Sequence, residues 1–177
     1  MKNKKQKGAV VRDKKITIED QSLASKLFNS GFFGAFKDGV LYLSQEEALY
    51  LNQKKELELF DVAGKKLGKN AFLASAEKYD KRFLLRYSVF RDLRSLGYIP
   101  KTALKYGGDF RVYGKGEHPG EAHASWILFV SSEHERMPFL QFSAVNRVAH
   151  SVRKNVLFAV VDDEDSVTYY ETKWLKM

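Results

Sequence analysis

The chain has 177 residues, no cysteine and a formal net charge of +8, with 44% hydrophobic and 14% aromatic residues. This hydrophobic content is enough for a packed core, which argues against disorder, and the lack of cysteine excludes disulfide frameworks, thiolate zinc sites and cysteine nucleophiles. No apolar stretch approaches the roughly 20 residues that span a bilayer, and no apolar segment follows the N-terminal lysines as it would in a secretory signal. We therefore expect a cytoplasmic globular protein with one large domain or two small ones.

Most of the excess positive charge lies at the N-terminus. Residues 1–15 contain six lysines, one arginine and one aspartate, a net charge of +6, which leaves only +2 for the rest of the chain. We expect residues 1–15 to form a flexible basic tail. Such a tail either adds non-specific attraction to phosphate or simply solubilises the chain, so the net charge alone does not identify a nucleic-acid partner.

Short alternating elements follow and predict a small N-terminal α+β domain over residues 16–80. The helix that begins after Ser44 has a capping box, because Glu47 follows three residues later. The Gly and Asp of the turn at 37–39 separate two apolar runs. Strands are expected at 15–19, 31–36, 39–43 and 57–60, and helices at 20–29, 44–52 and 69–78.

Residues 81–177 predict a second α+β domain, in which helices flank a mixed β-sheet. Apolar residues recur every three or four positions over 80–97, which indicates a helix. The continuous apolar run at 156–161 is typical of a strand buried on both faces. After the first helix we expect strands at 98–101, 110–113 and 125–131, a helix at 138–153, and strands at 156–161 and 167–172.

Tyr113, His123 and Lys154 of this second domain are suited to cleaving RNA without a metal. When the 2′-OH of RNA attacks the adjacent phosphate, a base must take its proton, a positive charge must stabilise the phosphorane-like transition state, and an acid must protonate the leaving 5′-oxygen. Histidine suits the role of acid and lysine supplies the charge. Tyrosine is a weak base unless cations stand close, and Lys154 and Arg153 are the candidates for this.

The segments around these three residues carry the argument, since each residue type alone is common. Residues 106–113 (YGGDFRVY) are similar to the Tyr-Gly-x-Asp-Phe-x-x-Tyr segment of the archaeal tRNA-splicing endonucleases, and residues 147–154 (RVAHSVRK) to their Arg-Val-x-His-Ser-x-Arg-Lys segment. His123 falls where this family has its histidine, ahead of an aromatic-apolar strand. The helix at 87–98, which runs into residues 101–105, also matches. The resemblance covers residues 80–177 strongly and 16–62 weakly.

The resemblance implies a specific activity. Members of the family excise introns from precursor tRNA at a bulge-helix-bulge, without a cofactor, and leave 2′,3′-cyclic phosphate and 5′-OH ends. On this analogy Tyr113 is the general base, His123 the general acid and Lys154 the transition-state stabiliser. Arg147 matches the arginine that stacks on a flipped bulge base, and Tyr169 is a candidate for the second stacking residue.

The resemblance also implies an assembly with two active sites. In the family an acidic loop of one subunit enters a basic pocket of another, and the matching segment here is Asp162-Asp163-Glu164-Asp165. A chain that carries all three catalytic residues fits a homotetramer, while a heterotetramer with a separate structural subunit is the alternative. Without the resemblance, this segment would read equally well as an ordinary solvated turn.

The histidine assignment has a competitor. The family commonly has a glutamate directly before its histidine, whereas here Ala122 stands there and Glu121 lies one residue further back. His118 is close by, in a segment with glycine and proline. We prefer His123 because it abuts the predicted strand, and we interpret His150 as structural or as a residue that supports a catalytic side chain.

Two other functions compete with this interpretation. Glu171-Thr172-Lys173 has the Glu-x-Lys form found in magnesium-dependent nucleases, with Asp162 or Asp163 upstream. The other alternative is a non-catalytic RNA-binding or assembly subunit, although such subunits generally lack the three catalytic residues. A protein that binds RNA only through its basic tail would be a further variant of this alternative.

Overall fold

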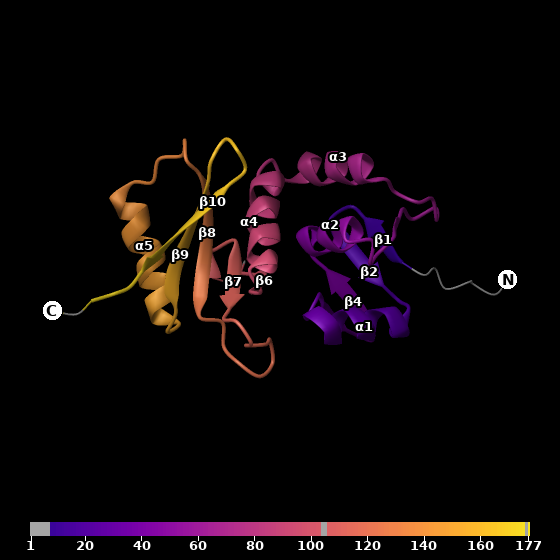
Figure 1. The fold of residues 1–177 in the computed structure, drawn as a ribbon, viewed down its shortest axis with the longest axis horizontal. Helices are drawn as coiled ribbons and strands as arrows, with labels where there is room; N and C mark the ends of the chain where they lie inside the picture. Colours follow the sequence, from indigo (N-terminus) through magenta and orange to yellow (C-terminus); the bar gives the residue numbers. More distant parts are fainter. Residues whose placement is uncertain (1–7, 104–105, 176) are drawn as a thin grey trace. The chain divides into compact units, whose positions relative to one another are not determined.

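A computed structural model describes residues 8–103, 106–175 and 177 of the chain. The described residues form five α-helices and ten β-strands in two five-stranded sheets, which confirms the predicted α+β class. Contacts divide the chain into two units, Met1–Phe83 and Leu84–Met177 (Figure 1). None of the described helices is long and apolar enough to cross a bilayer.

The first unit contains a sheet with the strand order β3-β4-β2-β1-β5, in which only β1 and β5 are parallel. The prediction of a flexible tail over residues 1–15 is wrong for residues 9–12. These residues form the first strand, which pairs with two other strands, and Ala9 is fully buried. Pairing with a strand some 50 residues away is not visible in local composition. Residues 1–7 of the predicted tail lie outside the described residues. The strands are β1 Ala9–Arg12, β2 Lys15–Ile18, β3 Ala35–Lys37, β4 Val40–Leu43 and β5 Leu59–Phe60.

Three helices complete this unit: α1 Gln21–Gly31, α2 Gln45–Gln53 and α3 Lys69–Tyr79. The predicted capping box of α2 is confirmed, because the Ser44 hydroxyl accepts from the Glu47 N–H and the Glu47 carboxylate accepts from the Ser44 N–H. The second Glu47 oxygen accepts from the Gly34 N–H at 2.9 Å. The strand expected at 31–36 is confined to β3, because Phe32 adopts the left-handed conformation that ends α1.

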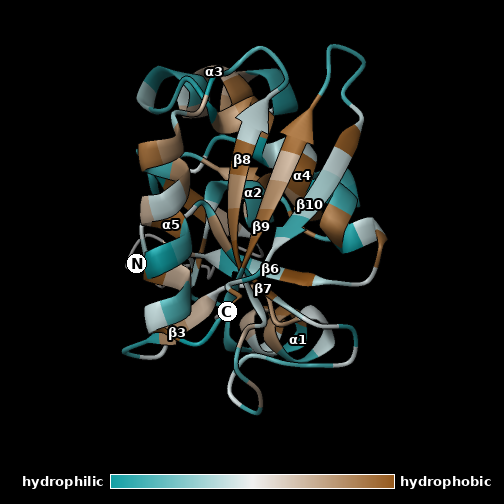
Figure 2. Cartoon of the chain, turned by 90° about the vertical axis from the view of Figure 1, so that its left-hand side faces the viewer, coloured by the Kyte–Doolittle hydropathy of each residue, from teal (hydrophilic) through white to brown (hydrophobic). Residues whose placement is uncertain are grey.

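The second unit contains a mixed sheet with the order β10-β9-β8-β7-β6, in which only β8 and β9 are parallel. Each predicted strand is present within two residues of its expected ends. Apolar residues run along β8 and β9 at the centre of the sheet (Figure 2). The strands are β6 Ile99–Thr102, β7 Phe110–Tyr113, β8 Trp126–Ser132, β9 Asn155–Val161 and β10 Val167–Thr172.

Two helices cover opposite faces of this sheet. Helix α4 (Phe83–Ser95) contributes Phe90, whose ring centroid lies 6.0 Å from that of Phe110 on β7. Helix α5 (Phe139–Ser151) packs on the other face, where Ala149 forms a buried cluster with Ile127 and Val156. Successive strand residues point to alternate faces, so each strand position faces one helix or the other.

The segment before β7 fixes that strand against β8. A Cβ atom on Gly108 would lie 2.5 Å from the Ile127 Cγ2 and 3.1 Å from the Leu128 carbonyl oxygen, so only glycine fits. Next to it, the Asp109 N–H donates to the Leu128 carbonyl at 2.9 Å, and the Asp109 carboxylate accepts from the Val130 N–H at 2.8 Å. The motif at 106–113 therefore sets the register of β7. Residues 104 and 105, which precede it, lie outside the described residues.

We expect Gly108→Ala to lower the free energy of unfolding by about 1–3 kcal/mol, because the added methyl overlaps a packed side chain and backbone. Ser143→Ala, at an exposed position of α5, is the control and should change stability by no more than about 0.5 kcal/mol. Guanidinium unfolding followed by circular dichroism measures both. Equal midpoints for wild type and Gly108→Ala would show that β7 does not depend on this close approach.

Candidate active site

Three neighbouring strand ends meet at one edge of the second sheet. Because β7 is antiparallel to β8 and β8 is parallel to β9, the C-terminal end of β7 lies beside the N-terminal ends of the other two. The register pairs Val112 with Trp126 and Trp126 with Asn155. Tyr113 is the last residue of β7, His123 lies three residues before β8, and Lys154 immediately precedes β9. The fold thus brings the three segments to a common edge.

Lys154 is held at this edge by the end of α5. Arg153 adopts a positive φ of 55°, and the Lys154 N–H donates to the Ala149 carbonyl at 2.9 Å, which turns the chain out of the helix. The Lys154 amine then donates to the Ala124 carbonyl at 2.7 Å. This amine therefore lies beside the backbone of the residue that follows His123.

Tyr113 lies on the sheet face covered by α5 and is only 5% exposed. Arg111, two residues earlier on the same strand, faces the same way, and its guanidinium carbon lies 5.9 Å from the Tyr113 ring centroid. Lys154 and Arg153 were the predicted cations near this tyrosine. The structure shows Arg111 in contact with the ring, whereas the Arg153 side chain is exposed.

The positive charges at this edge affect one another. The pKa of Lys154 is lowered, first by partial burial of the amine and then by the positive charge of Arg111. The hydrogen bond from Lys154 goes to a backbone carbonyl rather than to a carboxylate, so it brings no negative charge to the site. Lys154 and Arg111 therefore bring two positive charges to this edge that have no ion-pair partner among the described residues, which suits an anion such as a phosphate.

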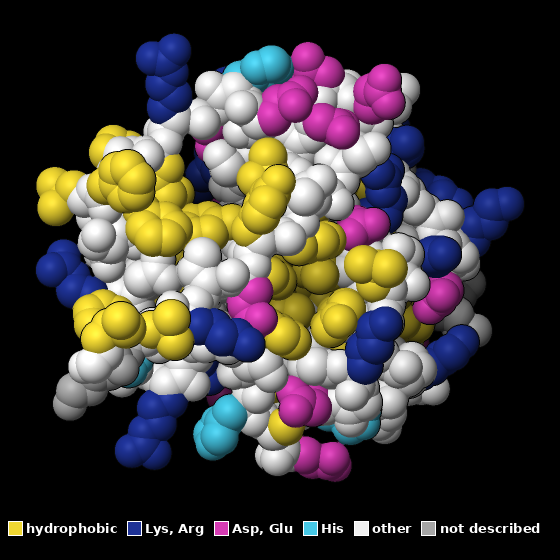
Figure 3. Space-filling view, turned by 60° about the vertical axis from the view of Figure 1, so that its left-hand side comes forward, with side chains coloured by type: hydrophobic (Ala, Val, Ile, Leu, Met, Phe, Trp, Pro, Cys, Tyr) yellow, Lys and Arg dark blue, Asp and Glu magenta, His cyan; other side chains and the backbone are white. Residues whose placement is uncertain are grey.

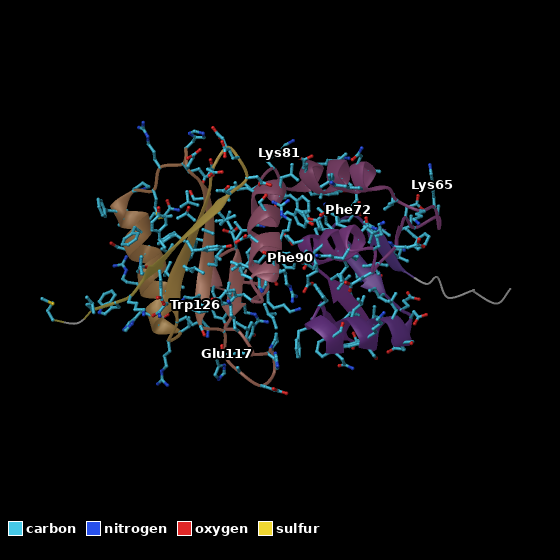
Figure 4. The ribbon with its side chains drawn as sticks, viewed as in Figure 1. Lys65, Phe72, Lys81, Phe90, Glu117 and Trp126 are labelled. Carbon is cyan, nitrogen blue, oxygen red and sulfur yellow. The ribbon has the colours of Figure 1, made fainter. Side chains whose placement is uncertain are left out.

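His123 is exposed on the loop between β7 and β8. Glu117 fastens this loop at its two ends, since its carboxylate accepts from the Gly114 N–H at 2.9 Å and from the Ser125 hydroxyl at 3.2 Å (Figure 4). Sequence reasoning missed Glu117, because nothing in the sequence indicates that one carboxylate spans the loop. The alternative histidine, His118, is partly buried, and its carbonyl accepts from the backbone N–H of Glu121 and Ala122.

The comparisons with known proteins identify the family. Residues 83–169 match the family model described as tRNA intron endonuclease, catalytic C-terminal domain, and residues 8–73 match the one described as tRNA intron endonuclease, N-terminal domain. The chain belongs to the tRNA intron endonuclease family. It is therefore an RNA endonuclease, and the resemblance seen in its motifs is confirmed.

Curated relatives match along most of the chain. A tRNA-splicing endonuclease of Thermococcus onnurineus is 39% identical over 158 residues, which cover 89% of this chain and 90% of the relative. A tRNA-splicing endonuclease of Methanothermobacter thermautotrophicus is 37% identical over 169 residues, 93% of this chain and 95% of the relative. One from Methanococcus vannielii is 38% identical over 176 residues, 99% and 98% of the two chains.

Arg147 and Tyr169 lie on opposite sides of the endonuclease sheet. Arg147 is exposed on α5, one turn before the helix ends. Tyr169 faces α4, where its hydroxyl donates to the Asp92 carboxylate at 2.8 Å, and its pKa is raised by burial and then by this carboxylate. The two residues predicted to stack on one RNA base are thus not brought together within a single chain. His150 stacks on Trp174 with a centroid distance of 5.2 Å, which agrees with a structural role.

The acidic segment 162–165 forms the turn between β9 and β10. One Asp162 oxygen accepts from the N–H groups of Glu164 and Ser166, at 2.9 and 2.8 Å, which shapes the turn. Asp163 contacts His134 at 3.0 Å. On the face of the molecule shown in Figure 3, several acidic side chains gather beside a histidine. The contact raises the pKa of His134.

Asp165 is tied to α4. Its carboxylate accepts a hydrogen bond from the Ser88 hydroxyl and forms an ion pair with Arg91 at 2.8 Å. Burial acts to raise the pKa of Asp165, but the contacts with Ser88 and Arg91 outweigh it and the pKa is lowered. Asp163 and Asp165 are thus engaged within the chain, whereas the Glu164 side chain has no hydrogen bond or ion pair to any other described residue.

The carboxylates of the magnesium alternative do not meet. Glu171 lies near the C-terminal end of β10, and Asp162 and Asp163 precede the other end of that strand. One Glu171 oxygen accepts from the Trp126 indole at 2.9 Å and from the Asn155 amide at 2.8 Å. In the described part of the chain, the group that could hold a metal is Glu133, His134 and Asp163, at the edge of the sheet opposite Tyr113.

Proposed function

We propose that this endonuclease excises introns from precursor tRNA at bulge-helix-bulge sites by a metal-independent reaction that leaves 2′,3′-cyclic phosphate and 5′-OH ends. We expect it to act in the cytoplasm. The observation that carries the proposal is the meeting of a phenol, an imidazole-bearing loop and an amine at the edge formed by β7, β8 and β9. The relatives are tRNA-splicing endonucleases, which supports the choice of substrate.

Each of the three residues performs one part of the cleavage reaction. The Tyr113 oxygen takes the proton of the attacking 2′-OH, and the 2′-oxygen forms a bond to phosphorus. The Lys154 ammonium stabilises the negative charge that develops on the non-bridging oxygens. The His123 imidazolium gives its proton to the 5′-oxygen as the bond from phosphorus to that oxygen breaks. His123 is exposed and can recover its proton from solvent.

Arg147 is our candidate for contact with a bulge base. It is exposed near the end of the helix that leads into Lys154, and a guanidinium plane stacks well on an unpaired base. A stacking role for Tyr169 requires a different geometry. Because Tyr169 faces α4 and Arg147 lies on α5, the two can hold one base only if they come from different copies of the chain.

We further propose that the active form is a homotetramer in which the turn 162–165 of one copy enters a basic pocket of another. A heterotetramer with a separate structural subunit is the alternative. The internal contacts of Asp163 and Asp165 support this proposal, because they give the turn a defined shape before it meets a partner. The Glu164 side chain has no hydrogen-bond or ion-pair partner among the described residues and is our candidate for the contact between copies.

The other two functions are less well supported. A magnesium nuclease of the Glu-x-Lys type needs carboxylates that converge, and Glu171 lies at the end of β10 remote from Asp162 and Asp163. A non-catalytic subunit would have no need of three reactive groups at one sheet edge. Both alternatives make different predictions about cleavage by the purified chain.

The proposed function is tested by incubating a bulge-helix-bulge RNA with the purified chain in excess EDTA and analysing the product ends. We expect cleavage at both bulges, with 2′,3′-cyclic phosphate and 5′-OH ends, because the acid, the base and the charge are all protein side chains. Cleavage only after addition of magnesium would favour the metal-dependent alternative. A chain that binds but never cleaves this RNA would be a binding or assembly subunit.

We expect His123→Ala to slow single-turnover cleavage by about 10²–10⁴-fold while the affinity for precursor RNA changes little, because the residue transfers a proton and does not anchor the substrate. His118→Ala is the matched control and should cleave at nearly the wild-type rate. Cleavage rate and filter-binding affinity are measured in parallel. Normal cleavage by His123→Ala together with an inactive His118→Ala would show that the acid is assigned to the wrong histidine.

We expect the combined change of Asp162, Asp163 and Asp165 to Asn and Glu164 to Gln to weaken assembly, because it removes the charge that a basic pocket would bind. Light scattering after gel filtration should then show a smaller species than the wild-type tetramer of 20.3-kDa chains. Glu121→Gln, an exposed acid outside the turn, is the control. An unchanged mass for the fourfold variant would exclude the turn as a docking element.

A further inference from the structure

We propose that Arg111 is a second cation of the active site and binds a non-bridging oxygen of the scissile phosphate beside Lys154. This inference rests on the proposed function and adds a phosphate-binding residue to it. Arg111 occupies a position that the motif at 106–113 leaves unspecified, between the phenylalanine and the tyrosine, so the resemblance implies no role for it.

The sheet register brings Arg111 to the reactive edge. It pairs with Ile127 across β7 and β8 and therefore faces α5, as does Tyr113 two residues later. Its guanidinium carbon lies 5.9 Å from the Tyr113 ring centroid. An anion bound next to the Tyr113 hydroxyl would thus lie within reach of a long side chain that is already fixed on the same strand.

The charges around Arg111 favour an anion. Arg111 and Lys154 are close enough for the charge of one to lower the pKa of the other, yet neither forms an ion pair with an acidic side chain among the described residues. Two cations held together without a counter-charge repel each other, and a phosphate between them would turn this repulsion into attraction.

The hydrogen-bonding groups of Arg111 are also unused. Its Nε is buried and has no hydrogen-bond partner, and its other guanidinium nitrogens bind none of the described residues. A guanidinium carries five N–H donors in a planar fork that matches phosphate oxygens, whereas the Lys154 ammonium acts as a point charge. Lys154 would therefore hold the phosphate through its charge, whereas Arg111 would also orient the phosphate through directional hydrogen bonds.

The test compares Arg111→Gln and Arg111→Lys with Arg136→Gln, which removes an exposed positive charge between β8 and α5, away from the site. Single-turnover cleavage in EDTA should slow by about 10²–10³-fold in Arg111→Gln, as for loss of one transition-state donor, and by less in Arg111→Lys. Arg136→Gln should cleave at nearly the wild-type rate. Affinity for a precursor with a 2′-deoxy cleavage site should change only by about threefold, because one phosphate among many is affected.

Replacing a non-bridging phosphate oxygen with sulfur distinguishes a direct contact of Arg111 with the phosphate from an indirect effect of Arg111 on Tyr113. Wild type should cleave one of the two phosphorothioate diastereomers at the scissile site more slowly, and this penalty should largely disappear in Arg111→Gln. A slow variant with an unchanged sulfur penalty would make Arg111 a positioning residue and overturn the inference. NMR titration of the Lys154 amine checks that the site is folded, since Arg111→Gln should raise its pKa.

The outcomes distinguish this inference from the proposed function. Failure of the wild-type chain to cleave bulge-helix-bulge RNA in EDTA would reject the proposed function itself. Cleavage by wild type together with an equal rate and sulfur penalty in Arg111→Gln would reject the role of Arg111 alone. If Arg111→Gln proves unstable, Arg111→Lys decides, because it keeps the charge and most of the packing while losing the planar fork.

Discussion

The active-site edge depends on the pairing of β7, β8 and β9. A parallel pair of strands needs a long crossover, and α5 supplies it between β8 and β9. The helix must end where β9 begins, so the turn that closes α5 delivers Lys154 to the same place where β7 ends in Tyr113. Neither residue needs a loop of its own to reach the site. A rigid sheet and a helix end hold them, which suits groups whose positions must be accurate to a fraction of an ångström.

The motif segments have structural as well as chemical roles. Gly108 and Asp109 lock β7 onto β8, and the last turn of the second motif closes α5 through the positive φ of Arg153. The residues that carry the family resemblance are therefore partly those that align the strands. This explains why a segment of eight residues can identify the family although only two of its residues, Arg111 and Tyr113, have a proposed role in the reaction.

The sequence allowed much of this site to be predicted, and the limits have physical causes. The two sheets, the capping box at Ser44 and the strand ends at Tyr113 and Lys154 follow from periodicity and motif, which are local. Pairing partners are not local. Strand β1 was mistaken for a tail because lysines dominate the composition of residues 1–15 and one of its two partner strands, β5, lies some 50 residues away. Arg111 was overlooked because its face became known only with the register.

Contacts between side chains of different helices and strands could not be predicted from the sequence either. The family analogy joined Arg147 and Tyr169, but the alternation of β10 turns Tyr169 toward α4. The acidic turn was predicted as a docking loop or an ordinary solvated turn, and neither interpretation indicated that two of its carboxylates contact His134 and α4. In each case the spacing along the chain was correct and the direction of the side chain was not available.

The Glu117 carboxylate has a consequence for how such enzymes diverge. This carboxylate accepts hydrogen bonds from Gly114 and Ser125 and so joins the two ends of the loop between β7 and β8. Changes within the loop are therefore not expected to move the strands of the sheet. Residues inserted, lost or exchanged there are therefore expected to leave Tyr113, Arg111 and Lys154 in place. His123, our proposed proton donor, is carried by this closed segment, so its reach and its neighbours can change independently of the rest of the proposed site.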